Sequence, residues 1–426
     1  MRTLRLLLLL AAVPLPALAQ RTVEISGANF RPLPLAYPAA MAQGAGADVT
    51  RELDDTLQFD FAAAGIFQLL DRAGYLSAAS EGVDAASIKF ANWSNVGAEM
   101  LIKVQVAETG NGAVRADLRA YNVGSGSEQF KISESGQAAN VRRVAHLLAD
   151  KVYEKLTGEP GPFRSRIAYV RKTGSNKDVF VADWDGKNPK RVTAGGLNLL
   201  PALHPDGETV AFTSYMRGRP DLFAQRPGVM PKLLENRGQM ATGVAYSPDG
   251  KHIAYSLATG ESAQIYIALA DGSEAKAITN TSAFINSSPS WSPDGKRITF
   301  VSNRAGSPQV YVMNWDGSQV RRLTFQGSYN QTPDWSPRGD LIVFTARDER
   351  NAFDIFTVHV DSGKISRVTQ GQGNNEEACF SPNGRLLLFT SSRGGARELW
   401  ISTLDGEQQR KLSLERGDYT TPDWAR

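Results

Sequence analysis

Residues 289–302, Pro-Ser-Trp-Ser-Pro-Asp-Gly-Lys-Arg-Ile-Thr-Phe-Val-Ser, decide the fold because close variants of this stretch recur through the second half of the chain. The variants are Leu203-His-Pro-Asp-Gly207, Tyr246-Ser-Pro-Asp-Gly250, Trp335-Ser-Pro-Arg-Gly339 and Phe380-Ser-Pro-Asn-Gly384. Their glycines recur with a period of 43 to 45 residues. A fixed period of this size indicates a repeat architecture, in which neighbouring units bury each other's hydrophobic faces.

Each repeat contains the signals of four short strands. Ser-Pro-Asp-Gly has the residues of a type I turn, with Pro at the second position and Gly at the fourth. Aliphatic and aromatic residues then alternate, as in Ile298 and Phe300, which predicts a strand with one buried face. A second aromatic such as Tyr311, a turn such as Asp316-Gly317 and a pair such as Leu323-Thr324 complete the unit. Four strands with short turns are typical of a β-propeller blade.

The two ends of the repeat array complement each other. Ile167 and Tyr169 match the aliphatic and aromatic positions of a sixth unit, but no Trp-Ser-Pro strand precedes them. The missing strand occurs at the other end, where residues 422–426, Pro-Asp-Trp-Ala-Arg, repeat the Pro-Asp-Trp of residues 333–335. We therefore expect the C-terminal residues to complete the first blade and close a six-bladed ring without an exposed sheet edge. The alternative is an open solenoid with unmatched ends.

A region of mixed secondary structure precedes the repeats. A helical pattern covers about residues 48–70, and the stretches 100–106 and 114–121 alternate like two strands of a hairpin, with 130–132 as an extension. Apolar residues follow helical spacing from Val141 to Leu156 and stop before Gly158 and Pro160. The fold class is therefore an α/β N-terminal domain followed by an all-β six-bladed β-propeller.

The chain divides into three segments. Residues 1–19 have a basic start, an apolar run and Ala17-Leu-Ala19, which predicts a secretory signal peptide cleaved after Ala19; an uncleaved anchor is the alternative. Residues 20–160 form the mixed α/β domain with an extended N-terminal segment, and residues 161–426 form the propeller. The net charge of +3 gives no electrostatic case for nucleic acid, and no later segment is long and apolar enough for membrane insertion.

The sequence lacks the motifs of an enzyme or a metal protein. A Gly-x-Ser-x-Gly nucleophile motif is missing, and the histidines His146, His204, His252 and His359 do not have ligand spacing. Residues 183–188, Asp-Trp-Asp-Gly-Lys-Asn, resemble a calcium loop but lack its downstream Glu. The lone cysteine excludes an internal disulfide. The sequence thus predicts a binding protein without catalytic residues, metal or cofactor.

The predicted binding surface is the mouth of the propeller channel. The Ser-Pro-Asp-Gly and Asp-Gly turns on one face are short and nearly constant, whereas the connections on the other face are longer and differ between blades. We expect arginines of the outer connections, such as Arg304 and Arg393, to form its rim. The mouth itself is predicted from connections that lead into inner strands: Met240, Thr242, Asn286, Ser287, Ser288, Gln331, Thr332, Glu376, Glu377 and Tyr419.

The order of signal peptide, small α/β domain and Trp-Ser-Pro-Asp-Gly propeller resembles the TolB family, the periplasmic component of the Tol–Pal cell-envelope system. The resemblance implies a monomer that binds the lipoprotein Pal at the propeller mouth, and other outer-membrane lipoproteins as further partners. It also implies roles in outer-membrane integrity, constriction during cell division and bacteriocin import. The alternative is an accessory propeller of a peptidase-like or carbohydrate-binding protein. The implied TolA-binding segment is the mature N-terminus, Gln20, Arg21, Thr22, Val23, Glu24 and Ile25.

Overall fold

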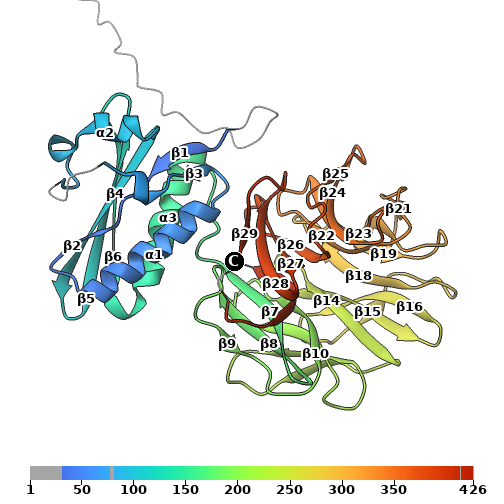
Figure 1. Cartoon of the computed structure of the whole chain (residues 1–426). Helices are drawn as coiled ribbons and strands as arrows, with labels where there is room; N and C mark the ends of the chain where they lie inside the picture. Colours follow the sequence, from blue (N-terminus) through green and yellow to red (C-terminus); the bar gives the residue numbers. More distant parts are fainter. Residues whose placement is uncertain (1–30, 77–80, 413, 426) are drawn as a thin grey trace, which may run out of the picture.

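A computed structural model describes residues 31–76, 81–412 and 414–425 (Figure 1). The predicted signal peptide and the segment from Gln20 to Ile25 lie outside the described residues. An α/β part comes first along the chain, and a ring of antiparallel sheets follows it (Figure 1). The boundary predicted at residue 160 falls between the last helix and the first propeller strand. None of the described helices has the length and apolar character that a membrane crossing requires.

The N-terminal part is built on one mixed sheet with the strand order β3-β1-β4-β5-β6, and β2 pairs with β4 beside β1. The predicted hairpin is formed by β4 and β5, and β6 extends it in antiparallel register. In contrast, β1 pairs in parallel with both β3 and β4, and β2 pairs in parallel with β4. The local alternation of residues did not predict these parallel pairs. The strands are β1 (Leu33–Ala36), β2 (Met41–Gln43), β3 (Phe67–Leu69), β4 (Met100–Gly110), β5 (Ala113–Asn122) and β6 (Ser127–Gln137).

Two long helices, α1 (Ala47–Ala63) and α3 (Val141–Thr157), pack together against this sheet, and short α2 (Phe90–Asn95) lies over the other face. The predicted helix over 48–70 ends earlier than expected, because Gly65 has a φ of 75° and the chain then enters β3. The left-handed Gly158 ends α3 at the predicted position. The 3₁₀ helices are η1 (Arg72–Gly74), η2 (Ala85–Ser87) and η3 (Ala138–Asn140).

The propeller has six blades, each a four-stranded antiparallel sheet, as the repeats predict. In all five Ser-Pro-Asp-Gly variants, the glycine N–H donates to the carbonyl three residues earlier, as a type I turn requires. Blades 1 to 3 contain β10 (Asn198–Leu203), β11 (Val210–Ser214), β12 (Asp221–Gln225) and β13 (Lys232–Glu235); β14 (Met240–Tyr246), β15 (His252–Thr259), β16 (Ser262–Leu269) and β17 (Lys276–Ala277); and β18 (Asn286–Trp291), β19 (Arg297–Ser302), β20 (Gln309–Asn314) and β21 (Arg321–Arg322).

The sixth blade, which contains Ile167 and Tyr169 and comes first along the chain, joins the two ends of the array and confirms the predicted closure. Its sheet has the order β30-β7-β8-β9, and Trp424 pairs with Ile167 across β30 and β7. The Trp424 indole N–H also donates to Ser165 Oγ at 2.6 Å. Blades 4 to 6 contain β22 (Asn330–Trp335), β23 (Leu341–Arg347), β24 (Phe353–His359) and β25 (Ile365–Arg367); β26 (Asn375–Phe380), β27 (Leu386–Gly394), β28 (Ala396–Thr403) and β29 (Gln409–Lys411); and β30 (Asp418–Ala425), β7 (Arg166–Thr173), β8 (Asn176–Asp183) and β9 (Lys190–Arg191).

The N-terminal part and the propeller share a continuous hydrophobic core. Trp184, in the turn between β8 and β9, is fully buried and packs 5.1 Å from Phe163 and 5.2 Å from Phe59 of α1 (ring centroids). Its indole N–H donates to the Asp60 carboxylate at 3.1 Å, and burial raises the pKa of Asp60 to about 6. The turn between β8 and β9 of the sixth blade is therefore a central contact between the propeller and the N-terminal part.

Ion pairs reinforce the junction at the linker. Glu159 lies between Arg338 of blade 4 and Arg385 of blade 5, with N···O distances of 2.9 and 2.6 Å. Arg338 belongs to one variant of the Ser-Pro-Asp-Gly turn and Arg385 directly follows another, in which Asn383 donates to the Pro160 carbonyl. These departures from the repeat therefore mark where the linker contacts the propeller.

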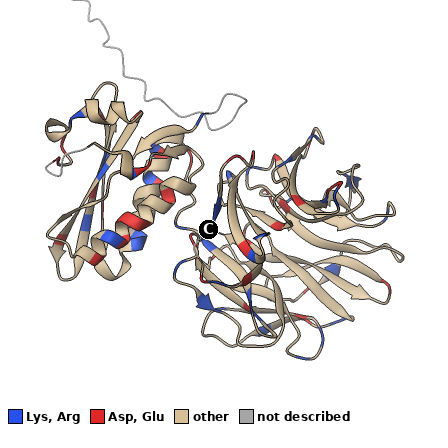
Figure 2. Cartoon of the chain, in the orientation of Figure 1, with Lys and Arg blue, Asp and Glu red and all other residues tan. Residues whose placement is uncertain are grey.

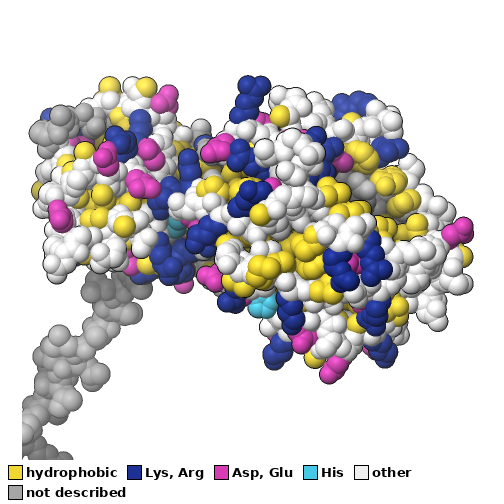
Figure 3. Space-filling view, turned by 90° about the horizontal axis from the view of Figure 1, so that it is seen from below, with side chains coloured by type: hydrophobic (Ala, Val, Ile, Leu, Met, Phe, Trp, Pro, Cys, Tyr) yellow, Lys and Arg dark blue, Asp and Glu magenta, His cyan; other side chains and the backbone are white. Residues whose placement is uncertain are grey.

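Charge is otherwise distributed evenly over the propeller. Acidic and basic residues are interspersed across the blades, whereas α1 carries mainly acidic residues (Figure 2). Lys and Arg side chains do gather where the N-terminal part meets the propeller (Figure 3).

Candidate partner-binding site

The inner strands of the six blades surround a cavity of about 390 Å³ in the propeller channel. Each inner strand contributes the same three positions, such as Ser288, Pro289 and Ser290 of β18. The cavity extends toward the turn face, where Pro248 and Pro293 of two Ser-Pro-Asp-Gly turns also line it. The channel is thus lined by equivalent residues of successive repeats, so differences between repeats determine its chemistry.

Every inner strand has a bulge at the same position. The register with the neighbouring strand shifts in all six blades, and the residue at the shift adopts a left-handed conformation. Non-glycine residues in this conformation cost about 1–3 kcal/mol and tend to cluster at functional sites. Only blade 2 has the glycine that relieves this cost. The residues are Leu200, Gly243, Ser288, Thr332, Glu377 and Thr421, with φ between 48° and 63°.

Carboxylates concentrate on one side of the channel, in blades 4 to 6. Asp334 accepts hydrogen bonds from Ser290 Oγ of blade 3 at 2.9 Å and from the Phe380 N–H of blade 5 at 3.0 Å. Asp423 accepts from the Leu203 N–H of blade 1 at 2.6 Å. These side chains connect neighbouring blades, while blades 1 and 2 place Ala202 and Ala245 at the equivalent position.

Burial makes these carboxylates easier to protonate. It raises the pKa of Asp423 to about 7 and raises the pKa values of Asp334, Glu376 and Glu377, although hydrogen bonds to Asp334, Glu377 and Asp423 partly oppose the shift. Cys379 lies between them, and burial raises the pKa of its thiol well above the usual range. The thiol is therefore protonated and unreactive.

Apolar side chains are exposed on the mouth face beside blades 1 to 4. Phe325 is 72% exposed in the connection that enters blade 4, and Phe284 and Ile285 are exposed in the connection that enters blade 3. Tyr215 and Met216 add to this face from blade 1. Exposed aromatic and aliphatic groups favour a protein interface. The sequence analysis did not predict these exposed apolar residues. The signal that could have revealed them is that they lie in the connections, outside the alternating pattern of the strands.

The structure separates the ten predicted mouth residues into groups. They belong to the inner strands β14, β18, β22, β26 and β30 rather than to connections, because each strand begins earlier than expected. Tyr419 is buried against Tyr169, with ring centroids 5.5 Å apart, and Asn286 is fully buried, so neither presents its side chain to a partner. Met240 is exposed at the mouth, and the channel cavity is lined by Ser288, Thr332 and Glu377. Partly exposed side chains complete the set: Thr242, Ser287, Gln331 and Glu376.

Two of the predicted rim arginines have structural contacts. Arg304 donates to Asn286 Oδ1 at 2.8 Å and lies 5.0 Å above the ring of Tyr311. Arg393 repeats this arrangement in blade 5, where it donates to Asn375 and lies 4.0 Å above Trp400. These guanidinium groups connect strands within their blades, so the rim offers less free positive charge than the sequence predicts.

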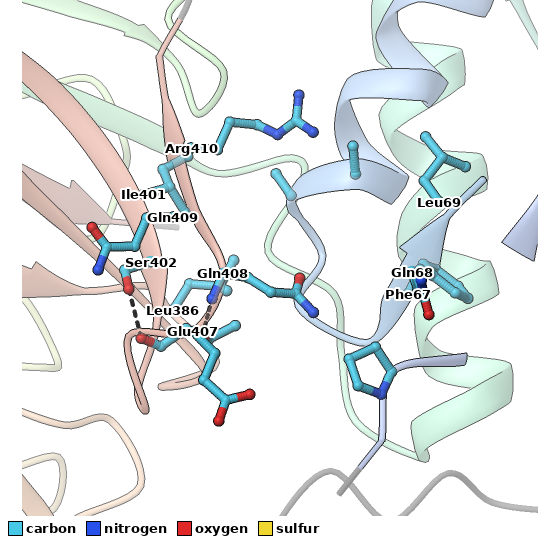
Figure 4. Close-up of a pocket in the computed structure, with 14 residues that line it drawn as sticks. Phe67, Gln68, Leu69, Leu386, Ile401, Ser402, Glu407, Gln408, Gln409 and Arg410 are labelled. Carbon is cyan, nitrogen blue, oxygen red and sulfur yellow. Dashed lines mark hydrogen bonds between the residues drawn. The ribbon is translucent and has the colours of Figure 1, made fainter. Parts of the chain in front are cut away.

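A second groove of about 470 Å³ lies between the N-terminal part and blade 5 (Figure 4). Phe67, Gln68 and Leu69 of β3 form one wall, and residues of β28, β29 and the turn between them, such as Gln408 and Arg410, form the other. Pro32, near the start of the described residues, also lines the groove. Because β3 is the edge strand of its sheet, the groove has the geometry to accept an extended segment.

Comparison with known proteins identifies the relatives of this chain. The family model for the TolB amino-terminal domain matches residues 21–129, and the model for the TolB beta propeller domain matches residues 153–426. The Tol-Pal system protein TolB of Myxococcus xanthus is 60% identical over 99% of this chain and 98% of its own length. The corresponding protein of Anaeromyxobacter dehalogenans is 43% identical over 98% of this chain and 96% of its own.

A solved structure shares the architecture. The crystal structure of TolB from Acinetobacter baumannii superposes with a TM-score of 0.79 at 25% identity, covering 93% of this chain and 97% of the other. These relatives carry the name of a Tol-Pal system protein rather than that of an enzyme, which supports the prediction that the chain is not an enzyme.

Proposed function

Because the chain belongs to the TolB family of Tol-Pal system proteins, we propose that its propeller mouth binds Pal and that its mature N-terminus binds TolA. In this role the protein is a periplasmic scaffold that supports outer-membrane integrity and constriction during division. Other outer-membrane lipoproteins are candidate ligands of the same mouth, and bacteriocins would use the same contacts for import. The scaffold acts as a monomer after signal-peptide cleavage behind Ala19.

The exposed apolar groups beside the channel are the observation that carries the Pal proposal. Phe325, Phe284 and Ile285 supply large contact area at one side of the mouth, and Glu376 and Glu377 supply acceptors at the other. Interfaces concentrate their binding energy in a few such central residues surrounded by polar groups. A partner segment with an apolar anchor and hydrogen-bond donors would match both sides.

Two exposed aromatic residues on opposite faces provide the test. Phe325→Ala removes an anchor at the mouth, and Trp315→Ala is the matched control, because Trp315 is 49% exposed on the turn face. We expect Phe325→Ala to weaken Pal binding by about 2 kcal/mol or more in calorimetry and the control to bind normally. Loss of binding in the control together with normal binding in Phe325→Ala would place the Pal site on the turn face.

The TolA proposal rests on the mature N-terminal segment. Deleting residues 20–25 should abolish TolA binding and preserve the melting temperature, because the sequence offers no local strand that would pair with this segment. TolA binding by the deleted protein at normal affinity would refute the assignment.

The groove beside β3 suggests how the two partners could influence each other. If the segment from Gln20 to Ile25 docks in the groove beside Pro32, TolA and this groove compete for the same segment. Any change that Pal causes in this docking must be matched by a reciprocal effect of TolA on Pal affinity. Measuring Pal affinity with and without residues 20–25 gives the sign of the coupling, and identical affinities would exclude it.

A further inference from the structure

The junction between the two parts of the molecule contains a cluster of side chains that partner binding does not use. His146 of α3 lies beside the turn that follows β8, where Asp183 and Asp185 flank Trp184. One ligand atom from each of the three side chains lies within 4.8 Å of the others. The sequence shows these residues as an isolated histidine and an incomplete calcium loop, whereas the fold brings them together.

His146 has an unused nitrogen aimed into the cluster. Its side chain is only 5% exposed, and its Nε2 has no hydrogen-bond partner within the described residues. Nε2 lies 4.0 Å from Asp185 Oδ2, too far for a hydrogen bond. A buried ring nitrogen without a partner is costly unless a ligand satisfies it.

The other side of the imidazole is held as it would be in a metal site. His146 Nδ1 lies 2.8 Å from Asp60 Oδ2, and Trp184 Nε1 donates to the second oxygen of Asp60 at 3.1 Å. Histidines that bind metals usually donate their second N–H to a carboxylate, which fixes the orientation of the ring. Asp60 therefore occupies Nδ1 and leaves Nε2, which lies 4.0 Å from Asp185 Oδ2, available to a ligand.

We propose that His146 Nε2, Asp183 and Asp185 bind a divalent transition-metal cation of the Zn²⁺ class, with water as a fourth ligand. The imidazole favours Zn²⁺ over Ca²⁺ or Mg²⁺, which take oxygen ligands. Tetrahedral ligands about 2.1 Å from zinc lie roughly 3.4 Å apart, so the three atoms must approach by about 1 Å. Such an ion would clamp α3 of the N-terminal part to the closing blade.

Positive groups already present define what the metal must displace. The guanidinium of Arg142 donates to Asp185 Oδ2, and Arg166 Nε lies 3.7 Å from Asp183 Oδ1. Zinc binding would release Arg142 from Asp185 and any proton from His146 Nε2. Removing the Arg142 charge should consequently strengthen zinc binding, whereas a purely structural cluster predicts no such gain.

The experiment titrates the tag-free full chain with Zn²⁺ alone, using calorimetry and competition with a chelating dye. We expect one ion per chain, an affinity loss of about tenfold or more in His146→Gln and Asp183→Asn, and a severalfold gain in Arg142→Gln. His204→Gln is the matched control, because His204 lies near a single carboxylate, that of Asp206 at 3.3 Å, and its Nε2 lies 3.1 Å from the Gly250 carbonyl oxygen. Asp183 is 24% exposed, so its variant should fold, and melting without zinc checks this.

Three results would overturn the proposal. They are absence of zinc binding by the unaltered chain, equal affinity in Asp183→Asn, and an affinity in Arg142→Gln no higher than that of the unaltered chain. Zinc should also raise the melting temperature of the unaltered chain in a concentration-dependent way, because it binds only the folded arrangement.

Discussion

The Trp-Asp-Gly turn occurs in two blades, once under the N-terminal part and once in the open. Trp184 and Trp315 occupy equivalent positions, and in both turns the glycine N–H donates to the residue three positions earlier. In both turns the aspartate accepts the N–H two residues later. Yet Trp184 is fully buried, whereas Trp315 is 49% exposed. The local sequence therefore specifies the turn, and the neighbouring domain decides whether its side chains become core.

The largest loss of stability is expected from disrupting the sixth blade, which carries the buried Trp184 turn. Deleting residues 421–426 removes Trp424, whose ring stacks 6.0 Å from that of Trp184, and leaves Ile167 and Tyr169 exposed. We expect the melting temperature to fall by at least about 10 °C, measured by circular dichroism or calorimetry. An unchanged melting temperature would show that the ring does not depend on its closing strand.

The two tryptophans themselves give the direct test of the comparison. Trp184→Ala should cost about 3–5 kcal/mol of unfolding free energy because it empties the shared core. Trp315→Ala, at a largely exposed position, should change it by less than about 1 kcal/mol. Urea unfolding of both variants measures the difference, and equal costs would mean that the N-terminal part contributes little to the burial of Trp184.

The sixth blade, which the N-terminal part covers, and blade 3, which it leaves open, also differ in their inner strands. Strand β30 has Asp423 at the position where β18 has Ser290. Burial raises the native pKa of Asp423 to about 7 from an ordinary value of 3.8, so the native state binds its proton more tightly than the unfolded state. This contribution stabilises the protein at low pH and is lost as pH rises toward 7. We expect a loss of about 1–2 kcal/mol between pH 5 and pH 8.

Asp423→Asn removes this pH dependence and keeps a carbonyl oxygen for the Leu203 N–H. Urea unfolding of the variant and the unaltered chain at pH 5 and pH 8 isolates the contribution of Asp423 to the unfolding free energy. An identical pH dependence in the two proteins would exclude Asp423 as its source.

The smallest effect should come from the linker contact, which the open blade lacks. Its turn has Asp294 and Lys296 where blades 4 and 5 place Arg338 and Arg385 around Glu159. Hydrogen bonds from Arg385 lower the pKa of Glu159 to about 2 from 4.5. Glu159→Gln should cost about 1 kcal/mol or less, because the pair is partly exposed.

The sign of the pH effect is opposite to that of Asp423. A lowered native pKa stabilises the fold above pH 4.5, and this contribution is lost as pH falls toward 2. The difference in unfolding free energy between Glu159→Gln and the unaltered chain should therefore shrink over that range. The exposed Glu154→Gln on α3 serves as a control with no expected difference.

The repeats made the propeller predictable because each blade carries its own turn and alternation signals. Ring closure was also predictable, since residues 422–426 repeat a strand that the first unit lacks. The parallel pairing of β1 with β3 and β4 was not, because it joins segments far apart in the sequence without a local pattern. The same limit concealed the cluster around His146, which depends on how the two parts dock.

The details of the channel were less accessible to sequence reasoning. A non-glycine residue such as Thr332 or Glu377 gives no local signal of a left-handed conformation. Aligning the repeats with Gly243 would have pointed to it, because glycine tolerates this conformation without strain. Tyr419 and Asn286 were misplaced because a polar residue at the start of a strand can bond inward as well as face a partner.

The closing strand β30 also sets the order in which the molecule can assemble. Trp424 and its partner Ser165 are 259 residues apart, so a chain synthesised from its N-terminus contains all the other blade strands before the ring can close. Contacts of such long sequence separation form late and slowly. A growing chain would therefore lack its closed ring until synthesis is almost complete.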